Sequence, residues 1–173
     1  EDRHKRGLIL KYSLAENAIL GIHDKKPFAN GILIDYAKVK EYAKKLIKDF
    51  DIRTPNEEVM ASSLSGGNQQ KMVVAREIVK DPDLLIAAQP TRGLDVGAIE
   101  YIHKRLIAER DKNKAVLLVS LELDEIMSLS DRIAVIYDGR IVGILDAKDV
   151  TENELGLLMA GGTLAKKAEG GVE

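Results

Sequence analysis

Two short apolar segments on either side of a longer amphipathic one constrain the fold of this chain most. Residues 84–88 read Leu-Leu-Ile-Ala-Ala, and residues 115–120 read Ala-Val-Leu-Leu-Val-Ser. Such runs are typical of buried strands. Between them Ile99, Ile102 and Leu106 recur at helical spacing, and Asp95 precedes them as a helix cap. Strand, helix and strand in this order predict parallel strands in an α/β core.

The pattern continues to the end of the chain and also defines a helical region before the core. Asp138-Gly139 is a strong hairpin signal, and Ser13-Leu-Ala-Glu16 is a capping box that begins a short helix. The other expected elements are helices over 39–50, 122–129 and 149–160, hairpin strands over 132–137 and 140–145, and irregular chain over 24–30. We expect a helical subdomain with its flanking segment in residues 1–80, the α/β core in 81–160 and a disordered tail in 161–173.

Composition excludes several classes of function. Hydrophobic residues make up 45% of the chain and charged residues 31%, as in a globular protein, and the net charge of −2 predicts no nucleic-acid partner. Cysteine is absent and the three histidines are dispersed, so we expect no thiolate or histidine metal site. No apolar run approaches the roughly 20 residues that span a bilayer, so any membrane association must use a partner.

Residues 64–70, Leu-Ser-Gly-Gly-Asn-Gln-Gln, carry the strongest functional signal. They offer a serine hydroxyl, a side-chain carboxamide and the backbone N–H groups of two glycines, which no side chain screens. These groups stand at the start of a helix that we expect over residues 68–80. A helix N-terminus attracts phosphate because its N–H groups are unpaired and partly positive, and glycine allows close approach. The alternative is a Ser-Gly-Gly loop that only caps a helix. Seven residues in this order favour the phosphate-binding interpretation.

This heptapeptide resembles the signature motif of ABC-type ATPases, and residues 83–95 resemble the Walker B strand and D-loop of that family. The family usually ends the strand with an aspartate that holds Mg²⁺ through water and a glutamate that orients or deprotonates the attacking water. Ala88 and Gln89 stand at these positions. Alanine cannot hold a cation's water shell, and glutamine cannot accept a proton near neutral pH. Residues 119–125 resemble the switch region, where Leu121 replaces the usual histidine. The resemblance therefore implies a degenerate nucleotide site without a metal ligand at Ala88.

The phosphate-binding loop of this family is absent from the sequence. It needs Gly-x-x-x-x-Gly-Lys followed by Ser or Thr, and none of the 14 glycines is followed by lysine. Glu1-Asp2-Arg3 resembles the region at or beside the Q-loop. We therefore expect the C-terminal part of a nucleotide-binding domain, cut between its phosphate loop and its Q-loop. Such a fragment is expected to hold no cofactor and to be inactive alone.

Further segments are similar to the second nucleotide-binding half of ribose/galactose-type importers. These are residues 1–8, 13–17, 64–71 and 90–98. The Ala-Ala-Gln-Pro and Ser-Leu-Glu-Leu sequences at residues 87–90 and 120–123 look closer to the nucleoside branch. The resemblance implies a cassette that couples ATP binding and hydrolysis to import of a sugar or nucleoside. Its partners would be a second nucleotide-binding half and transmembrane permease subunits. Its location would be cytoplasmic, peripheral on the inner face of the cell membrane.

Head-to-tail pairing in this family gives the predicted site residues their roles. ATP and Mg²⁺ lie between the phosphate loop of one half and the signature motif of the other. The resemblance thus implies that a partner's ATP contacts Ser65, Gly66, Gly67 and Gln69. It also implies that Asp95, together with Arg92, carries information between the two sites. Two other classes of protein remain open: a soluble ABC protein that binds nucleic acid, and a regulatory or structural pseudo-ATPase without a part in hydrolysis.

Overall fold

The computed structural model describes residues 7–164, which form two compact units that divide after Val119. The segment Glu1–Arg3, which resembles the region beside the Q-loop, and residues 165–173 of the predicted tail lie outside this range. The N-terminal unit contains α1 (Leu14–Ala18), β1 (Ala29–Asn30), β2 (Leu33–Ile34), α2 (Tyr36–Asp49), the 3-10 helix η2 (Ala61–Ser63), α3 (Gly66–Ile78), β3 (Leu84–Ala88), α4 (Val96–Asp111) and β4 (Ala115–Val119). The C-terminal unit contains α5 (Leu123–Leu129), β5 (Arg132–Tyr137), β6 (Arg140–Asp146) and α6 (Glu152–Met159). The sequence-based boundaries at residues 80 and 160 stay predictions.

Helix α1 begins at the capping box that the sequence predicts. The Ser13 hydroxyl accepts from the amide of Glu16, and the Glu16 carboxylate accepts from the amide of Ser13. Four residues on, Asn17 is completely buried. Its carboxamide accepts from the amide of Ile9 at 2.9 Å and donates to the carbonyls of Ile9, Tyr12 and Ser13. Because every one of these polar groups is paired, the turn that leads into α1 is held rigidly.

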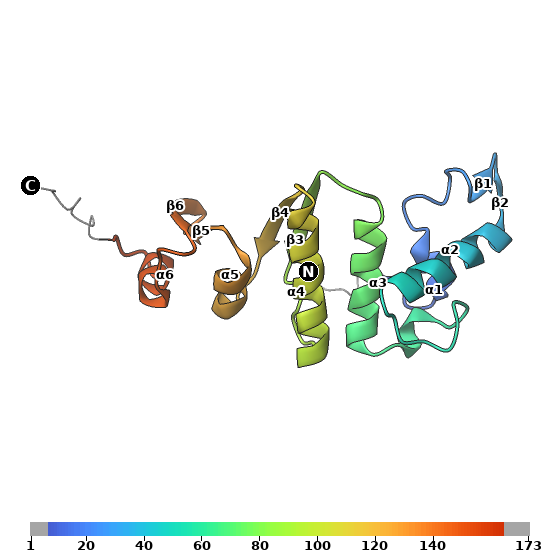
Figure 1. Cartoon of the computed structure of the whole chain (residues 1–173), viewed down its shortest axis with the longest axis horizontal. Coiled ribbons are helices and arrows are strands. Elements are labelled where there is room, and N and C mark those ends of the chain that lie inside the picture. Colours follow the sequence, from blue (N-terminus) through green and yellow to red (C-terminus); the bar gives the residue numbers. More distant parts are fainter. Residues whose placement is uncertain (1–6, 165–173) are drawn as a thin grey trace, which may run out of the picture. The chain divides into compact units, whose positions relative to one another are not determined.

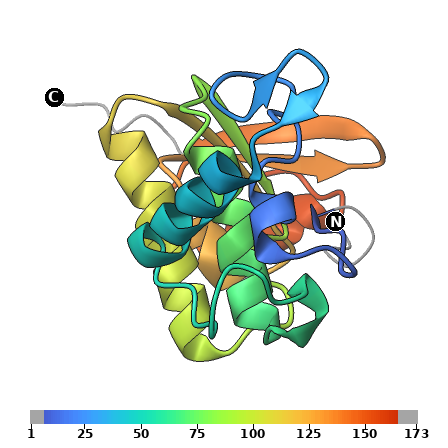
Figure 2. The same ribbon diagram turned by 90° about the vertical axis from the view of Figure 1, so that its right-hand side faces the viewer.

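An aliphatic core joins α1, α2 and α3 in the N-terminal unit. Leu14 from α1, Val39 and Ala43 from α2 and Met72 and Ala75 from α3 are all inaccessible to solvent. The segment over residues 24–30, expected to be irregular, instead contributes β1 to a short hairpin with β2. Its base is fixed by Phe28, which stacks edge-on against Tyr42. Figures 1 and 2 show this hairpin projecting from the unit, and Ile32 at its tip is 99% exposed.

Strands β3 and β4 pair in parallel, with Leu84 opposite Ala115 and Ala88 opposite Val119. Helices α3 and α4 lie side by side next to this sheet (Figure 1). The prediction of two fully buried strands is wrong for one face of the sheet. Exposure alternates along both strands, and Ile86 and Leu117 are 60% and 51% exposed. The reason is that a sheet alternates its side chains between two faces, and the helices of the N-terminal unit cover only one of them.

The C-terminal unit is a hairpin packed on a helix. Strands β5 and β6 pair antiparallel around the predicted Asp138-Gly139 turn, where both residues have positive φ. Their inward side chains pack with Leu155 and Leu158 of α6. A second capping box, between Thr151 and Glu154, begins that helix. Across residues 7–164, none of the helices combines the length and the apolar character that a bilayer crossing requires.

Candidate functional site

The predicted signature segment forms the N-terminus of α3, with Ser65 as its cap. The Ser65 side chain is exposed, and its Oγ accepts from the backbone amide of Asn68 at 3.4 Å and from Asn68 Nδ2 at 3.0 Å. The amides of Gly66 and Gly67 donate to no group within residues 7–164. Helix termini leave such donors unpaired, with a partial positive charge. The Ser65 hydroxyl and the Gly66 amide are therefore available to an anion at this point, whereas Gly67 is buried.

Gln69, predicted as a cofactor ligand, points into the protein. It is 5% exposed, and its Nε2 donates to the carbonyls of Ala61 and Leu64, both at 3.1 Å. These carbonyls belong to the segment that leads into the signature turn, so Gln69 supports that turn from beneath. Its Oε1 accepts no hydrogen bond among the described residues. A direct contact with a ligand stays a prediction for Gln69.

The first turns of α3 and α4 touch at Gly67. A Cβ added to Gly67 would lie 3.0 Å from the Cβ of Ala98 and 3.3 Å from Oδ2 of Asp95. The other carboxylate oxygen of Asp95 caps α4 by accepting from the amide of Ala98 at 2.9 Å. The structure thus brings together the predicted signature residue Gly67 and the predicted D-loop residue Asp95. It also shows a packing reason for glycine at position 67.

A second contact, one turn further along, joins the same two helices. The ammonium of Lys71 on α3 lies 4.4 Å from the ring centroid of Tyr101 on α4 and 2.9 Å from the carboxylate of Asp51. The hydrogen bond from Lys71, and then its charge, hold the pKa of Asp51 below its ordinary value. Arg105 of α4 stacks over Phe50, at the end of α2. Helix α3 is therefore held against α4 at two successive turns, at Gly67 and at Lys71.

Ala88 and Gln89 stand at the carboxyl end of β3, as predicted. The Gln89 amide donates to the carbonyl of Val119 at 2.8 Å, and its φ is 51°. Within residues 7–164 the other non-glycine residues with positive φ are Asp51, Asp81, Asn113 and Asp138. Asp and Asn adopt this region readily, whereas glutamine does so at a cost. Position 89 therefore carries backbone strain of the kind that persists at functional positions.

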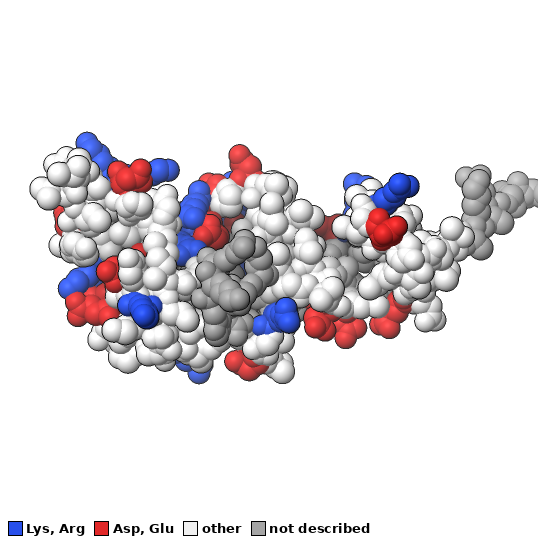
Figure 3. Space-filling model, turned by 180° about the vertical axis from the view of Figure 1, so that it is seen from behind, with Lys and Arg blue, Asp and Glu red and all other residues white. Residues whose placement is uncertain are grey.

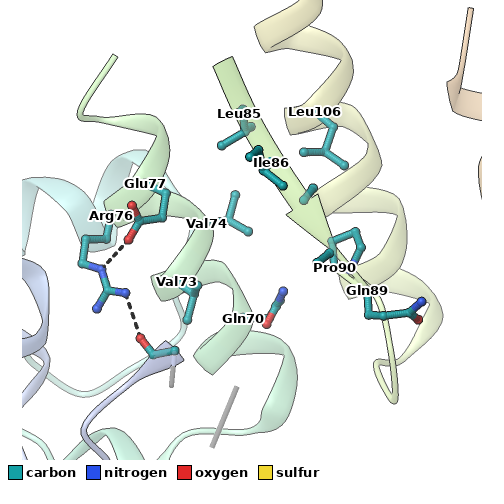
Figure 4. Close-up of a pocket in the computed structure, with 13 residues that line it drawn as sticks. Gln70, Val73, Val74, Arg76, Glu77, Leu85, Ile86, Gln89, Pro90 and Leu106 are labelled. Atoms are coloured by element: carbon teal, nitrogen blue, oxygen red, sulfur yellow. Dashed lines mark hydrogen bonds and ion pairs between the residues drawn. The ribbon is translucent and has the colours of Figure 1, made fainter. Parts of the chain in front are cut away.

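A cavity of about 250 Å³ separates β3 from α3 in the N-terminal unit (Figure 4). Ala88, Gln89 and Pro90 line it from the strand, and Gln70 and Val73 line it from the helix. Further along α3, Arg76 donates to Glu77 at 2.9 Å and to the Gly7 carbonyl at 2.8 Å, as the dashed lines show. The side of α3 that carries Gln70, Val73 and Val74 therefore faces the carboxyl end of β3.

The two remaining predicted site residues, Arg92 and Leu121, belong to different units of the chain. Arg92 is exposed between β3 and α4. Leu121 belongs to the C-terminal unit, where it is 78% exposed just before α5. Its side chain carries no donor or acceptor, and its place at the switch position of the family stays a prediction.

The residues present fit phosphate but not a metal ion. Residues 7–164 contain no cluster of His, Asp or Glu that could hold a metal, and Ala88 and Gln89 offer no carboxylate. The exposed Ser65 hydroxyl and the unpaired Gly66 amide at the start of α3 suit a phosphate oxygen. On the face shown in Figure 3, charged side chains of both signs are interspersed rather than gathered by sign.

The sequence did not predict the contacts that three polar residues make. Asn68 accepts from the amide of Arg53 and donates to Ser65. Gln70 lines the cavity, and Arg76 joins α3 to the backbone at Gly7. The heptapeptide contains Asn68 and Gln70, but which of its carboxamides faces inward depends on helix phase. Arg76 had a weak signal, a charged residue on an otherwise apolar helix face.

Known proteins resemble this chain in sequence and in fold. Residues 3–92 match the ABC transporter family. The nucleoside import ATP-binding protein NupA of Lactococcus lactis subsp. cremoris (strain MG1363) is 57% identical over 95% of this chain and 32% of its own length. The guanosine import ATP-binding protein NupO of Bacillus subtilis (strain 168) is 55% identical over 98% of this chain and 34% of its own length. The ribose import ATP-binding protein RbsA of the same strain is 40% identical over 94% of this chain.

Solved structures show the same fold. The dimeric post-hydrolysis structure of the cassette MJ0796 bound to ADP and Pi has a TM-score of 0.66 and 24% identity, and it covers 81% of this chain and 59% of that chain. The ADP conformation of the cassette MJ1267 has a TM-score of 0.63. Since the family match covers more than half of the residues, this chain belongs to the ABC transporter family, as part of an ATP-binding domain. It spans about a third of the length of the curated relatives it matches.

Proposed function

We propose that this chain supplies the signature motif to an ATP held by a partner nucleotide-binding half, and so couples ATP hydrolysis to import of a nucleoside or sugar. The observation that carries the proposal is the N-terminus of α3. There Ser65 is exposed and the amide of the half-buried Gly66 is unpaired, while the end of β3 lacks carboxylates. Binding groups without catalytic groups suit a half that completes another half's site.

The chain's own residues perform the binding part of the reaction. When bound, ATP and Mg²⁺ supply the reactive γ-phosphate and its charge-neutralising cation. The Ser65 hydroxyl donates to a phosphate oxygen, and the first-turn amides of α3 oppose the phosphate charge. Gln69 holds the preceding carbonyls in place, so these donors are preorganised. Asp95 and Arg92 transmit the state of this site to the end of β3, where Gln89 orients water without accepting its proton.

The names of similar proteins support import as the process served. They include nucleoside, guanosine and ribose import ATP-binding proteins, and the nucleoside relatives are more similar than the ribose ones. We therefore favour a nucleoside as solute. Permease subunits would be the membrane partners, and the chain would be peripheral on the inner face of the membrane. Exposed apolar side chains on the helical region, such as Ile32, Leu33 and Tyr36, supply surface for that contact.

The test is ATP hydrolysis by the complete transporter after Ser65→Arg. A guanidinium-bearing side chain at the cap of α3 blocks approach of the partner's phosphate, so hydrolysis should fall at least about tenfold. Ser62→Arg adds the same charge and bulk three residues earlier, at another exposed serine, and should leave the rate unchanged. Equal rates for wild type and Ser65→Arg would refute a role in trans and favour a pseudo-ATPase.

A second experiment tests whether this chain, without a phosphate-binding loop, can form a complete active site alone. The double variant Ala88→Asp, Gln89→Glu restores both carboxylates to this 173-residue chain. We expect no ATP hydrolysis from it, because the chain has no phosphate-binding loop and would supply only half of a site. Hydrolysis by the doubly substituted chain alone would contradict the proposal.

A further inference from the structure

The backbone amide of Arg53 determines which end of the Asn68 carboxamide is the oxygen and which is the NH₂ group. Asn68 Oδ1 lies 2.9 Å from the backbone nitrogen of Arg53. A backbone amide can only donate, so the carboxamide oxygen must face Arg53. The Nδ2 group, which can only donate, therefore faces Ser65, whose Oγ it reaches at 3.0 Å.

This arrangement also decides where the Ser65 proton points. A hydroxyl has two lone pairs and one hydrogen. One lone pair of Ser65 Oγ accepts from the Asn68 amide and the other from Asn68 Nδ2. Both acceptor positions are occupied, and the hydrogen finds no acceptor among residues 7–164. It is left to point away from Asn68, out of the exposed cap of α3.

We propose that Asn68 is a positioning residue that turns the Ser65 hydroxyl proton outward, toward an acceptor such as a phosphate oxygen. The inference rests on the proposed function for the identity of that acceptor. The hydrogen bonds that join Arg53, Asn68 and Ser65 do not depend on the proposed function. Hydrogen bonds in such a chain polarise one another, so the outward O–H becomes a stronger donor.

The proposal explains why aspartate would not serve at this position. Aspartate has nearly the same shape and still accepts from Arg53, but its second oxygen can only accept. The Ser65 proton would then turn inward to the carboxylate and would be lost to an external acceptor. A carboxylate in the first turn also favours the helix dipole. Asn68→Asp should therefore keep the fold while removing the donor.

The first arm of the test is a double-mutant cycle measured as ATP hydrolysis by the complete transporter. Asn68→Asp should lower the rate at least about tenfold, and in a Ser65→Ala background the same change should cost less than about twofold. Thermal unfolding should show no loss of stability for Asn68→Asp. If Asn68→Asp costs the same factor in both backgrounds, its charge acts directly and the proposal is overturned. An unaffected rate in Ser65→Ala alone would instead refute the proposed function.

The second arm needs neither nucleotide nor partner. Because the chain has no cysteine, Ser65→Cys introduces a single thiol. Donation from Asn68 stabilises the thiolate, and a carboxylate there destabilises it. Adding Asn68→Asp should raise the pKa of this thiol by about one unit or more, read from the pH dependence of its alkylation. An unchanged or lowered pKa would overturn the assigned direction of the hydrogen bond.

Discussion

Replacing Gln69 by glutamate tests whether this side chain supports the signature turn from within. The exchange keeps shape and volume but replaces an amide donor with an oxygen that faces the carbonyls of Ala61 and Leu64. Two hydrogen bonds are lost and a carboxylate is left buried without a partner. We expect the N-terminal unit to lose about 3–4 kcal/mol of unfolding free energy at neutral pH.

The loss of unfolding free energy in this variant should be smaller at acidic pH and should grow as the pH rises. Burial beside two carbonyl oxygens raises the pKa of the introduced carboxyl above its unfolded value of about 4.3. Below that value the carboxyl is protonated in both the folded and the unfolded protein. In the folded protein it then donates one hydrogen bond, so part of the lost stability returns. This part is lost again as pH rises through the folded pKa. Urea unfolding can be followed by tyrosine fluorescence, since four of the five tyrosines lie in this unit.

Gln70→Glu is the matched control, because Gln70 is the adjacent residue and is partly exposed. We expect it to change stability by less than about 0.5 kcal/mol and to show no comparable pH dependence. Equal losses for the two variants, or a loss at position 69 that deepens on acidification, would refute the reasoning.

Three further predictions concern packing, buried hydrogen bonds and pH. Gly67→Ala should lower the unfolding free energy by about 1–2 kcal/mol because the new Cβ meets Ala98. Adding Ala98→Gly should cancel the effect of the alanine at position 67. Additive losses from the two substitutions would contradict this. Asn17→Ala should cost about 3 kcal/mol in urea unfolding, since it strands the buried polar groups of Ile9 and its neighbours, and a cost below about 1 kcal/mol would exclude that role. Burial raises the pKa of Glu77, but Lys80 and Arg76 together lower it below the ordinary value. Its stabilising contribution is present above its unfolded pKa and is lost as pH falls through the folded one, so Glu77→Gln should flatten the acid limb of the stability–pH curve.

Local signals predicted much of the fold. The capping box at Ser13, the Asp-Gly turn at residue 138 and the cap at Asp95 all act within a few residues, and each appears where expected. The two short apolar runs also identified both strands of the parallel pair. The exposure of one strand face was missed, because whether a face is covered depends on other segments and not on the strand itself. The β1–β2 hairpin was missed because each of its strands has only two residues.

The candidate site was predictable in outline but not in its contacts. The heptapeptide located the N-terminus of α3, yet only the structure shows that Gln69 points inward and Gln70 toward the cavity. One step along a helix turns a side chain by about 100°, so the two glutamines cannot be distinguished without the packing. The contact between Gly67 and Ala98 joins positions far apart in the chain, and no local pattern indicates it.

The most direct test of the central claim is nucleotide protection of a thiol at position 65. Ser65→Cys in the complete transporter would be alkylated with and without ATP and Mg²⁺, and peptide mapping would assign the label to that position. If a partner's nucleotide covers the cap of α3, ATP should slow alkylation at least about tenfold, because the labelled fraction follows the open population. The same rate with ATP, with ADP and without nucleotide would contradict the account.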